Sequence, residues 1–351
     1  MSHMSDEIDQ QPYAVALTIE KLRPLAESIR QLAAGRRHVL FAGRGTSDNA
    51  AQYGRYLMEI ATQMRAALAA PSIATRYKTE LDLSDTVFIT VSQSGRTDEM
   101  LETQQWAASR NARTIAITND AASPLATEAG LAMVTMAGQE RAVPATKTYT
   151  SQLAAIAVLA ASLGPGGSSL EQDLSQVPDT LTELLDRHGI DEAVGLLATA
   201  SSWITVSRGL TYPTALEAGL KLEETCLRPV RALSYADLRH GPSAFLDSTT
   251  AAVVIAPPDG PLLDGLTRQA RDLRSTGAAD VGVGGDDDFQ ATCNLARPGP
   301  RLSELLAPLG LILPAQLIAE TMARHLGLDP DRPRGLTKVT QSEPGPSVIA
   351  R

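Results

Sequence analysis

The chain carries the same strand–turn–helix pattern twice. An apolar run followed by Arg-Gly and the start of a helix occurs at 39–51 and returns at 203–215, 164 residues later. A second apolar run at 87–91 is matched by 252–256, at an offset of 165. This repetition predicts two domains of one fold, and 351 residues suffice for two hydrophobic cores.

Apolar runs alternate with helical patterns in each half of the chain. The expected strands are 38–42, 87–91, 114–118, 131–136, 203–206, 252–256 and 279–283. The alternation predicts an α/β fold with two parallel sheets, each flanked by helices in a doubly wound, flavodoxin-like arrangement. Helices are also expected at 14–32, where Pro24 should kink or break the helix, and around 314–326.

The Gly- and Ser-rich stretch 164–169 marks the clearest boundary between the two halves. The expected limits are an N-terminal arm with a cloning remnant at 1–11, a first domain with its leading helix at 12–163, a linker and connector helix at 164–195, and a second domain at 196–338. Residues 339–351 show little periodicity and are expected to form a disordered tail.

Charge and cysteine content exclude several classes of protein. The formal net charge of −9 argues against nucleic-acid binding, which requires a basic surface. Cys226 and Cys293 have neither a metal-ligand nor a disulfide-framework spacing, which favours a reducing compartment. No secretory signal and no membrane-spanning apolar run is visible, so a cytoplasmic protein that does not bind membranes is expected.

Two polar turns follow predicted strands of the first half. The turn after 87–91 consists of Ser92, Gln93, Ser94, Gly95, Arg96 and Thr97, and the turn after 38–42 contains Gly45, Thr46 and Ser47. Anions bind where parallel strands end and helices begin, because unpaired N–H groups and the helix dipole meet there. One such turn could equally be an ordinary helix cap. Two turns in equivalent positions favour a phosphate site.

Three charged residues share one face of the predicted helix that begins near Pro213. Glu217, Lys221 and Glu224 stand at i, i+4 and i+7, and the first repeat has Tyr53, Leu57 and Ile60 at the same positions. A solvated salt-bridge stripe is the alternative. Apolar residues in the first repeat instead indicate an inward face, where a carboxylate with a raised pKa suits proton transfer.

His240 stands before Gly241 and Pro242 in a predicted turn. A histidine fixed in a turn is well placed for proton transfer, and a structural role is an equal alternative.

These motifs resemble the sugar isomerase (SIS) family, specifically the isomerase half of glucosamine-6-phosphate synthase and its deaminase relatives. The matching segments are the turns at 45–47 and 92–95, AGQE at 137–140 with VPATK at 143–147, TSQL at 150–153, the helix at 215–224, HGP at 240–242 and PRGLTK at 333–338. The resemblance covers nearly the whole chain after residue 12 and implies a tandem pair of SIS domains.

The resemblance implies a role for each candidate residue. The 6-phosphate of a hexose phosphate would be held by Ser47, Ser92, Gln93, Ser94 and Thr97, and the sugar would be lined by Gly45, Thr46, Val143 and Ala145. Glu224 would be the base that moves a proton between C1 and C2, and Glu217 and Lys221 would assist with hydroxyl protons. His240, from the neighbouring subunit of a homodimer, would open the ring. Lys338 would reach the open-chain carbonyl. No metal or organic cofactor is implied.

The chain differs from the synthase at several positions, and these differences affect which reaction is expected. The synthase has a glutaminase domain with an N-terminal cysteine nucleophile, and neither cysteine here is N-terminal, so glutamine-dependent synthesis is not expected. Ala145 stands where the synthase has serine, and Arg96 replaces an acidic residue. The expected function is an isomerising deaminase that converts glucosamine 6-phosphate to fructose 6-phosphate and ammonia.

Other interpretations remain open on the same residues. A deglycase of a fructosamine 6-phosphate, an aldose–ketose isomerase, and a dehydratase of an N-acylated sugar phosphate would use the same proton transfer. A non-catalytic sugar-phosphate sensor would need the phosphate turns but not Glu217, Lys221 and Glu224 together.

Overall fold

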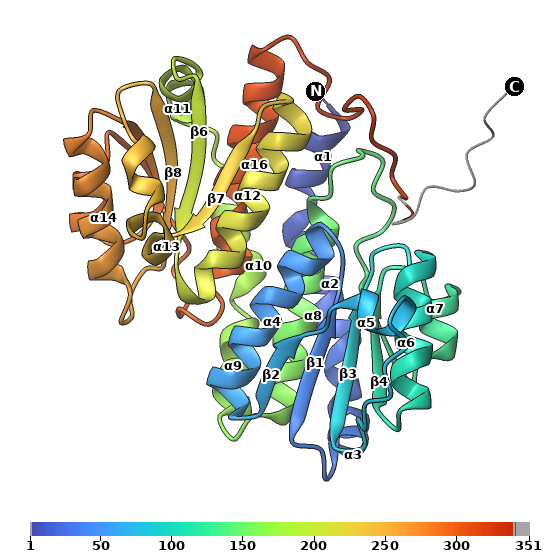
Figure 1. Ribbon diagram of the computed structural model, residues 1–351. Helices are drawn as coiled ribbons and strands as arrows, with labels where there is room; N and C mark the ends of the chain where they lie inside the picture. Colours follow the sequence, from blue (N-terminus) through green and yellow to red (C-terminus); the bar gives the residue numbers. More distant parts are fainter. Residues whose placement is uncertain (1, 340, 342–351) are drawn as a thin grey trace, which may run out of the picture.

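The computed structural model describes residues 2–339 and 341, and in it the chain forms two α/β domains that lie side by side (Figure 1). The first sheet contains β1 (His38–Ala42), β2 (Arg65–Leu68), β3 (Thr86–Val91), β4 (Arg113–Thr118) and β5 (Leu131–Val134). The second contains β6 (Ser202–Ser207), β7 (Val230–Ser234), β8 (Thr250–Ala256), β9 (Ala279–Gly284) and β10 (Leu295–Arg297).

Both sheets have the same topology. The strand orders are β2-β1-β3-β4-β5 and β10-β9-β8-β6-β7, and all pairings are parallel. Read from its other edge, the second order repeats the first, and this is the flavodoxin-like order. The predicted α/β fold with two doubly wound domains is therefore confirmed.

All seven expected strands are present, and three further strands were not predicted. These three, β2, β7 and β10, each lie at an edge of a sheet and contain partly exposed residues. The rest of the protein covers an edge strand less completely than an inner strand, so an edge strand needs no continuous apolar run. Strands without such a run could not be predicted from the sequence.

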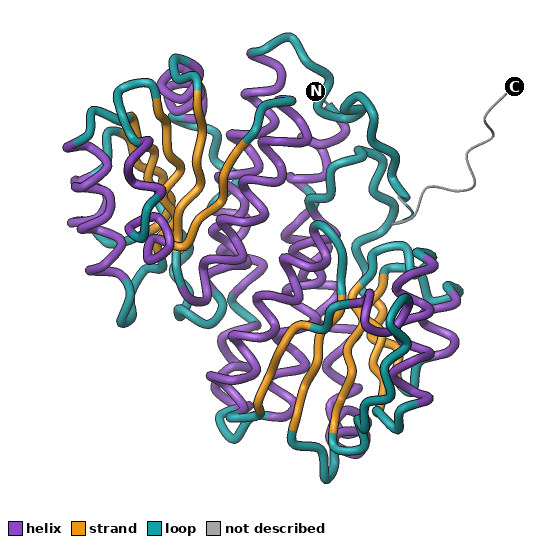
Figure 2. Tube along the Cα trace, in the orientation of Figure 1, coloured by secondary structure: helices purple, strands orange, loops and turns teal. Residues whose placement is uncertain are grey.

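Helices surround the two sheets and fill the space between them (Figure 2). Those of the N-terminal region and the first domain are α1 (His3–Asp9), α2 (Gln11–Leu22), the short 3-10 helix η1 (Arg23–Leu25), α3 (Ala26–Ala33), α4 (Thr46–Thr62), α5 (Pro71–Thr75), α6 (Asp98–Ser109), α7 (Pro124–Glu128) and α8 (Lys147–Leu163). The remainder are α9 (Gly167–Leu174), α10 (Val177–Glu183), α11 (Ile190–Ala198), η2 (Gly209–Thr211), α12 (Tyr212–Cys226), α13 (Tyr235–Arg239), η3 (Pro242–Phe245), α14 (Leu263–Ser275), α15 (Asp287–Thr292) and α16 (Ala307–His325).

Several helical segments differ from the expectations in their details. The helix expected at 14–32 is divided by η1 at Pro24, where proline was expected to interrupt it. The helix expected from 314 begins at Ala307 and contains Pro314. Residues expected as an N-terminal arm contain α1, because Met4 and Ile8, one turn apart, are both fully buried.

The connector also contains more helix than expected. Helix α9 begins at Gly167, inside the Gly- and Ser-rich stretch, and α10 and α11 follow before the second sheet. The tail expected at 339–351 lies outside the described residues, apart from Val339 and Gln341. Within the described residues, no helix combines the length and apolar character needed to cross a membrane.

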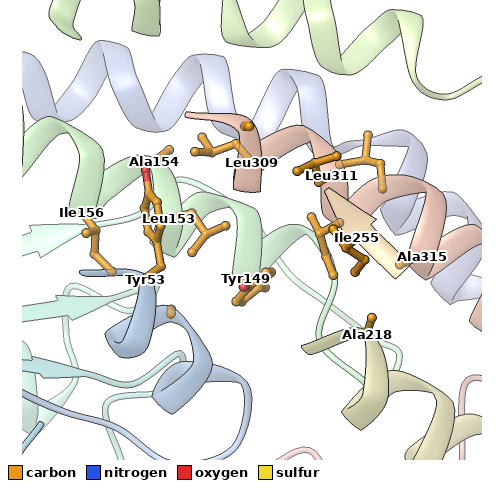
Figure 3. Close-up of a cluster of buried hydrophobic side chains, with 14 of the residues drawn as sticks. Tyr53, Tyr149, Leu153, Ala154, Ile156, Ala218, Ile255, Leu309, Leu311 and Ala315 are labelled. Carbon is orange, nitrogen blue, oxygen red and sulfur yellow. The ribbon is translucent and has the colours of Figure 1, made fainter. Parts of the chain in front are cut away.

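One continuous hydrophobic core joins the two domains. Helix α8 is buried along nearly its whole length, and so is α16. Figure 3 shows Tyr53, Tyr149 and Leu153 of the first domain in the same cluster as Ile255, Leu309 and Leu311 of the second. Helices α4 and α12 pack against each other across this core. The shared core therefore fixes the start of α4 beside the polar face of α12.

Candidate active site

A cavity of about 650 Å³ opens at the carboxyl ends of β1 and β3. This volume is typical of a small-molecule site. All five residues predicted to bind phosphate line it, namely Ser47, Ser92, Gln93, Ser94 and Thr97. Its walls also contain Gly45, Thr46, Val143, Ala145, Glu224 and Lys338. The structure thus brings together residues of both domains and of the C-terminal segment.

Two internal hydrogen bonds hold the shape of the turn between β3 and α6. The Ser92 Oγ accepts a hydrogen bond from the Gly95 N–H at 3.2 Å, and the Ser94 Oγ accepts one from the Arg96 N–H at 3.2 Å. Gly95 has φ of 60°, and a Cβ there would collide with Ser123. Glycine is therefore required at this position.

The second polar turn contributes the first residues of α4. Ser47 is buried in the first turn of this helix, and its Oγ accepts a hydrogen bond from Gln152 Nε2 at 3.0 Å. Gln152, on α8, lies within the TSQL segment that resembles the family, but sequence reasoning gave it no role. A hydroxyl that accepts from an amide keeps its own hydrogen available for an anion in the cavity.

A chain of polar contacts links the two domains behind the cavity. Lys221 Nζ lies 2.5 Å from Glu224 Oε2 and donates to Thr46 Oγ1 at 3.2 Å. Thr46 Oγ1 donates to Glu217 Oε1 at 3.0 Å, and Asn49 Nδ2 donates to Glu217 Oε2 at 2.8 Å. Glu224 is the member of the predicted triad that faces the cavity, whereas Glu217 and Lys221 are fully buried behind it.

Burial controls the ionisation of the two inner residues. Loss of solvation raises the pKa of Glu217 to about 7, although the Lys221 ammonium at 3.4 Å opposes this shift. Burial alone would lower the pKa of Lys221, but the carboxylates of Glu217 and Glu224 outweigh it and hold that pKa above its ordinary value. Glu217 can therefore gain and lose a proton near neutral pH, next to a charged lysine. A carboxyl group of this kind can relay protons during a reaction.

The raised pKa of Glu217 predicts a pH dependence of stability. The folded protein retains a proton that the unfolded chain releases above the ordinary glutamate pKa of 4.5. The stabilisation from this proton is fully present below about pH 4.5 and is lost as the pH rises to about 7. Urea unfolding at several pH values gives the free energy of unfolding of wild type and of Glu217→Gln. We expect the difference, wild type minus variant, to fall across this interval. A difference that is constant or rises with pH would contradict the assignment.

Lys338 is held at the cavity wall by a buried carboxylate. Its Nζ lies 2.6 Å from Glu140 Oε2 and donates to the Ala142 carbonyl oxygen at 2.7 Å. Glu140 also accepts from the N–H groups of Thr146 and Thr148 at the start of α8. Burial acts to raise the pKa of Glu140, but Lys338 and these hydrogen bonds outweigh burial and hold it below its ordinary value. In the sequence, Glu140 is visible only as part of a matching segment.

His240 lies away from this cavity in the same chain. It caps the end of α13, is exposed, and is absent from the cavity wall. Its predicted contribution to the site of a neighbouring subunit stays a prediction. No cluster of His, Cys, Asp or Glu side chains within the described part of the chain has the arrangement of a metal site.

Comparisons with known proteins agree with this architecture. A family model described as SIS domain matches residues 32–162. The isomerizing glutamine–fructose-6-phosphate aminotransferase of Methanothermobacter thermautotrophicus is 33% identical over 344 residues, which cover 97% of this chain and 57% of that protein. The corresponding enzyme of Thermococcus kodakarensis is also 33% identical, over 95% of this chain and 57% of its own length. The chain thus spans little more than half of these relatives.

Solved structures are similar over both domains. The C-terminal domain of glucosamine-fructose-6-phosphate aminotransferase from Francisella tularensis matches with a TM-score of 0.87 and 27% identity, covering 95% of this chain and 98% of that one. A glucosamine-6-phosphate deaminase from Thermotoga maritima matches with a TM-score of 0.78 and 24% identity, over 97% of this chain and 100% of that one, and shows likeness of fold.

Proposed function

The chain belongs to the SIS family, with two tandem SIS domains, and on this premise we propose that it is an isomerising deaminase of a hexosamine 6-phosphate. Glucosamine 6-phosphate is the favoured substrate, with fructose 6-phosphate and ammonia as products. The observation that carries the proposal is that the hydroxyl-rich phosphate turns and Glu224 share one cavity.

The reaction is proposed from the groups that line the cavity. With the phosphate in the turns at Ser47 and 92–97, the other end of an open-chain sugar faces Glu224 and Lys338. Glu224 removes the proton from C2 of the aldehyde, and the C1 oxygen takes up a proton, which gives an enolamine. Transfer of this proton from Glu224 to C1 gives the protonated imine at C2. Water adds to C2, and loss of the amine gives fructose 6-phosphate and ammonia.

The remaining groups support these steps. The Lys221 ammonium, 2.5 Å from Glu224, stabilises the ionised base, and Glu217 and Thr46 relay hydroxyl protons through their hydrogen bonds. Lys338 acts on the open-chain carbonyl once the sugar draws it from Glu140. In the proposed homodimer, the partner subunit supplies a second copy of His240 for ring opening. Both cysteines are free and buried, which agrees with the proposed cytoplasmic setting.

Substrate profiling tests the proposal. Purified protein is incubated separately with glucosamine 6-phosphate, galactosamine 6-phosphate, N-acetylglucosamine 6-phosphate and a fructosamine 6-phosphate, and loss of each substrate is measured together with ammonia and ketose phosphate. We expect equal amounts of ammonia and fructose 6-phosphate from the first compound. Ammonia from galactosamine 6-phosphate alone would keep the deaminase and change only the hexosamine. Turnover of the fructosamine 6-phosphate alone would assign a deglycase, and turnover of N-acetylglucosamine 6-phosphate alone would assign an isomerase or a dehydratase. Tight binding without any turnover would indicate a sugar-phosphate sensor.

A further inference from the structure

The phosphate turns offer neutral donors to a group that carries a negative charge. The side chains predicted to hold the phosphate are hydroxyls and one amide, and none of them is a cation. Among the described residues that line the cavity, the cations are Arg44 and Lys338. Lys338 is held by Glu140 and the Ala142 carbonyl. The phosphate therefore has one candidate counter-charge close to its turns, and this is Arg44.

Arg44 already makes the geometry with which guanidinium groups bind oxyanions. It lies in the turn between β1 and α4, next to Gly45, Thr46 and Ser47, and its Nε and Nη2 each lie 2.8 Å from an oxygen of Glu99. Two parallel bonds of this kind are equally available to phosphate. The Arg44 side chain is 49% exposed, whereas that of Glu99 is 16% exposed. The guanidinium therefore has room to turn toward the cavity.

Glu99 can release its partner at limited cost. It lies in the first turn of α6, the helix that begins just after the phosphate turn. Partial positive charge at a helix start stabilises a carboxylate there. Before substrate binds, the charge of Arg44 neutralises this carboxylate and so reduces its repulsion of an incoming anion.

We propose that Arg44 is a specificity-determining residue that exchanges Glu99 for the phosphate group of the substrate, an inference that rests on the proposed function. Arg44 supplies the positive charge that the neutral turns lack, and Glu99 competes for the same guanidinium and so weakens phosphate binding. The two members of one ion pair then have opposite effects on affinity.

An ion pair of the second domain provides the matched control. Arg271, on α14, pairs with Asp288 at 2.8 Å, and its side chain is 52% exposed, close to the value for Arg44. It is not part of the cavity wall. Its replacement by Gln removes the same charge from a similar ion pair, so an effect of net charge alone would appear in both variants.

Calorimetric titration with glucosamine 6-phosphate and with inorganic phosphate, at fixed ionic strength, tests the exchange. We expect Arg44→Gln to weaken binding by about 10–100-fold, the range for a lost charge-assisted hydrogen bond. We expect Glu99→Gln to tighten binding by about 3–10-fold, since it removes a competing surface ion pair. Arg271→Gln should stay within about twofold of wild type.

The opposite signs make the outcome decisive. Tighter binding by Glu99→Gln cannot arise from partial unfolding. Equal weakening of phosphate binding by Arg44→Gln and Glu99→Gln would show that the ion pair only stabilises the structure of the turn. This result would overturn the inference while leaving the proposed function intact. Unchanged affinity in both variants would also overturn it. Wild-type protein that binds neither ligand would overturn the proposed function, and the inference with it.

Discussion

Replacing Glu224 with Gln is expected to lower kcat by about 10²–10⁴-fold, the usual contribution of a general base. The amide keeps the shape of the side chain but cannot accept the proton from C2. Glu224 is the member of the charged triad that lines the cavity, and its side chain is 21% exposed, so it can reach a bound sugar. Affinity for the sugar phosphate should change little, because the phosphate turns lie on the other domain.

Glu223→Gln is the matched control for this prediction. Glu223 precedes Glu224 on α12 but accepts a hydrogen bond from the Val230 N–H and is not part of the cavity wall. Steady-state kinetics on the substrate found by profiling, together with titration calorimetry, separate turnover from binding. Near-normal kcat in Glu224→Gln, or an equal loss in both variants, would remove Glu224 from the proposed role.

Replacing Lys221 with Met is expected to lower the free energy of unfolding by about 3–5 kcal/mol, the range for breaking a buried ion pair. Lys221 is fully buried between Glu217, at 3.4 Å, and Glu224, at 2.5 Å. Without the Lys221 ammonium, Glu217 and Glu224 lose their shared counter-charge, so Glu217 either stays protonated or carries an unpaired buried charge. Urea unfolding at pH 7 measures the loss. Lys21→Met, which removes an exposed lysine paired with Glu20 at 3.5 Å, is the control, with an expected change within about 0.5 kcal/mol.

A double variant identifies the cause of this destabilisation. Adding Glu217→Gln to Lys221→Met removes one of the two unpaired carboxylates, so part of the lost stability should return. If the double variant is as unstable as the sum of the single variants, then the loss comes from packing, and the charged triad is not the reason. A small loss in Lys221→Met alone would contradict the account in the same way.

The fold was predictable because its main signals are local. A repeated apolar run followed by a polar turn predicted both sheets, and the inner strands contain such runs. The edge strands β2, β7 and β10 lack them, since only part of each strand is buried. Burial of α1 against α16 joins residues more than three hundred positions apart, and no local pattern indicates such a contact.

The site was predictable only in part, for a related reason. The phosphate turns and the charged face of α12 are visible as short motifs in the chain. Glu140 and Gln152 also lie in matching segments, but no local pattern indicated their contacts with distant residues: Glu140 holds Lys338, and Gln152 contacts Ser47. The outcome for Ile60 also shows this limit. It aligns with Glu224 and was expected to face inward, but it is 55% exposed, whereas Tyr53 and Leu57 of the same predicted face are fully buried.

Solvent-deuterium exchange tests the central claim, proton transfer by Glu224 within a sugar-phosphate cavity, most directly. Fructose 6-phosphate and an ammonium salt, which together form the C2 imine in the reverse direction, are incubated with the protein in D2O, and the carbon-bound hydrogen at C1 is followed by NMR. The account predicts incorporation of deuterium at C1 by wild type and by Glu223→Gln, and its loss in Glu224→Gln. Incorporation by Glu224→Gln at the wild-type rate, or none by wild-type protein that binds fructose 6-phosphate, would contradict it.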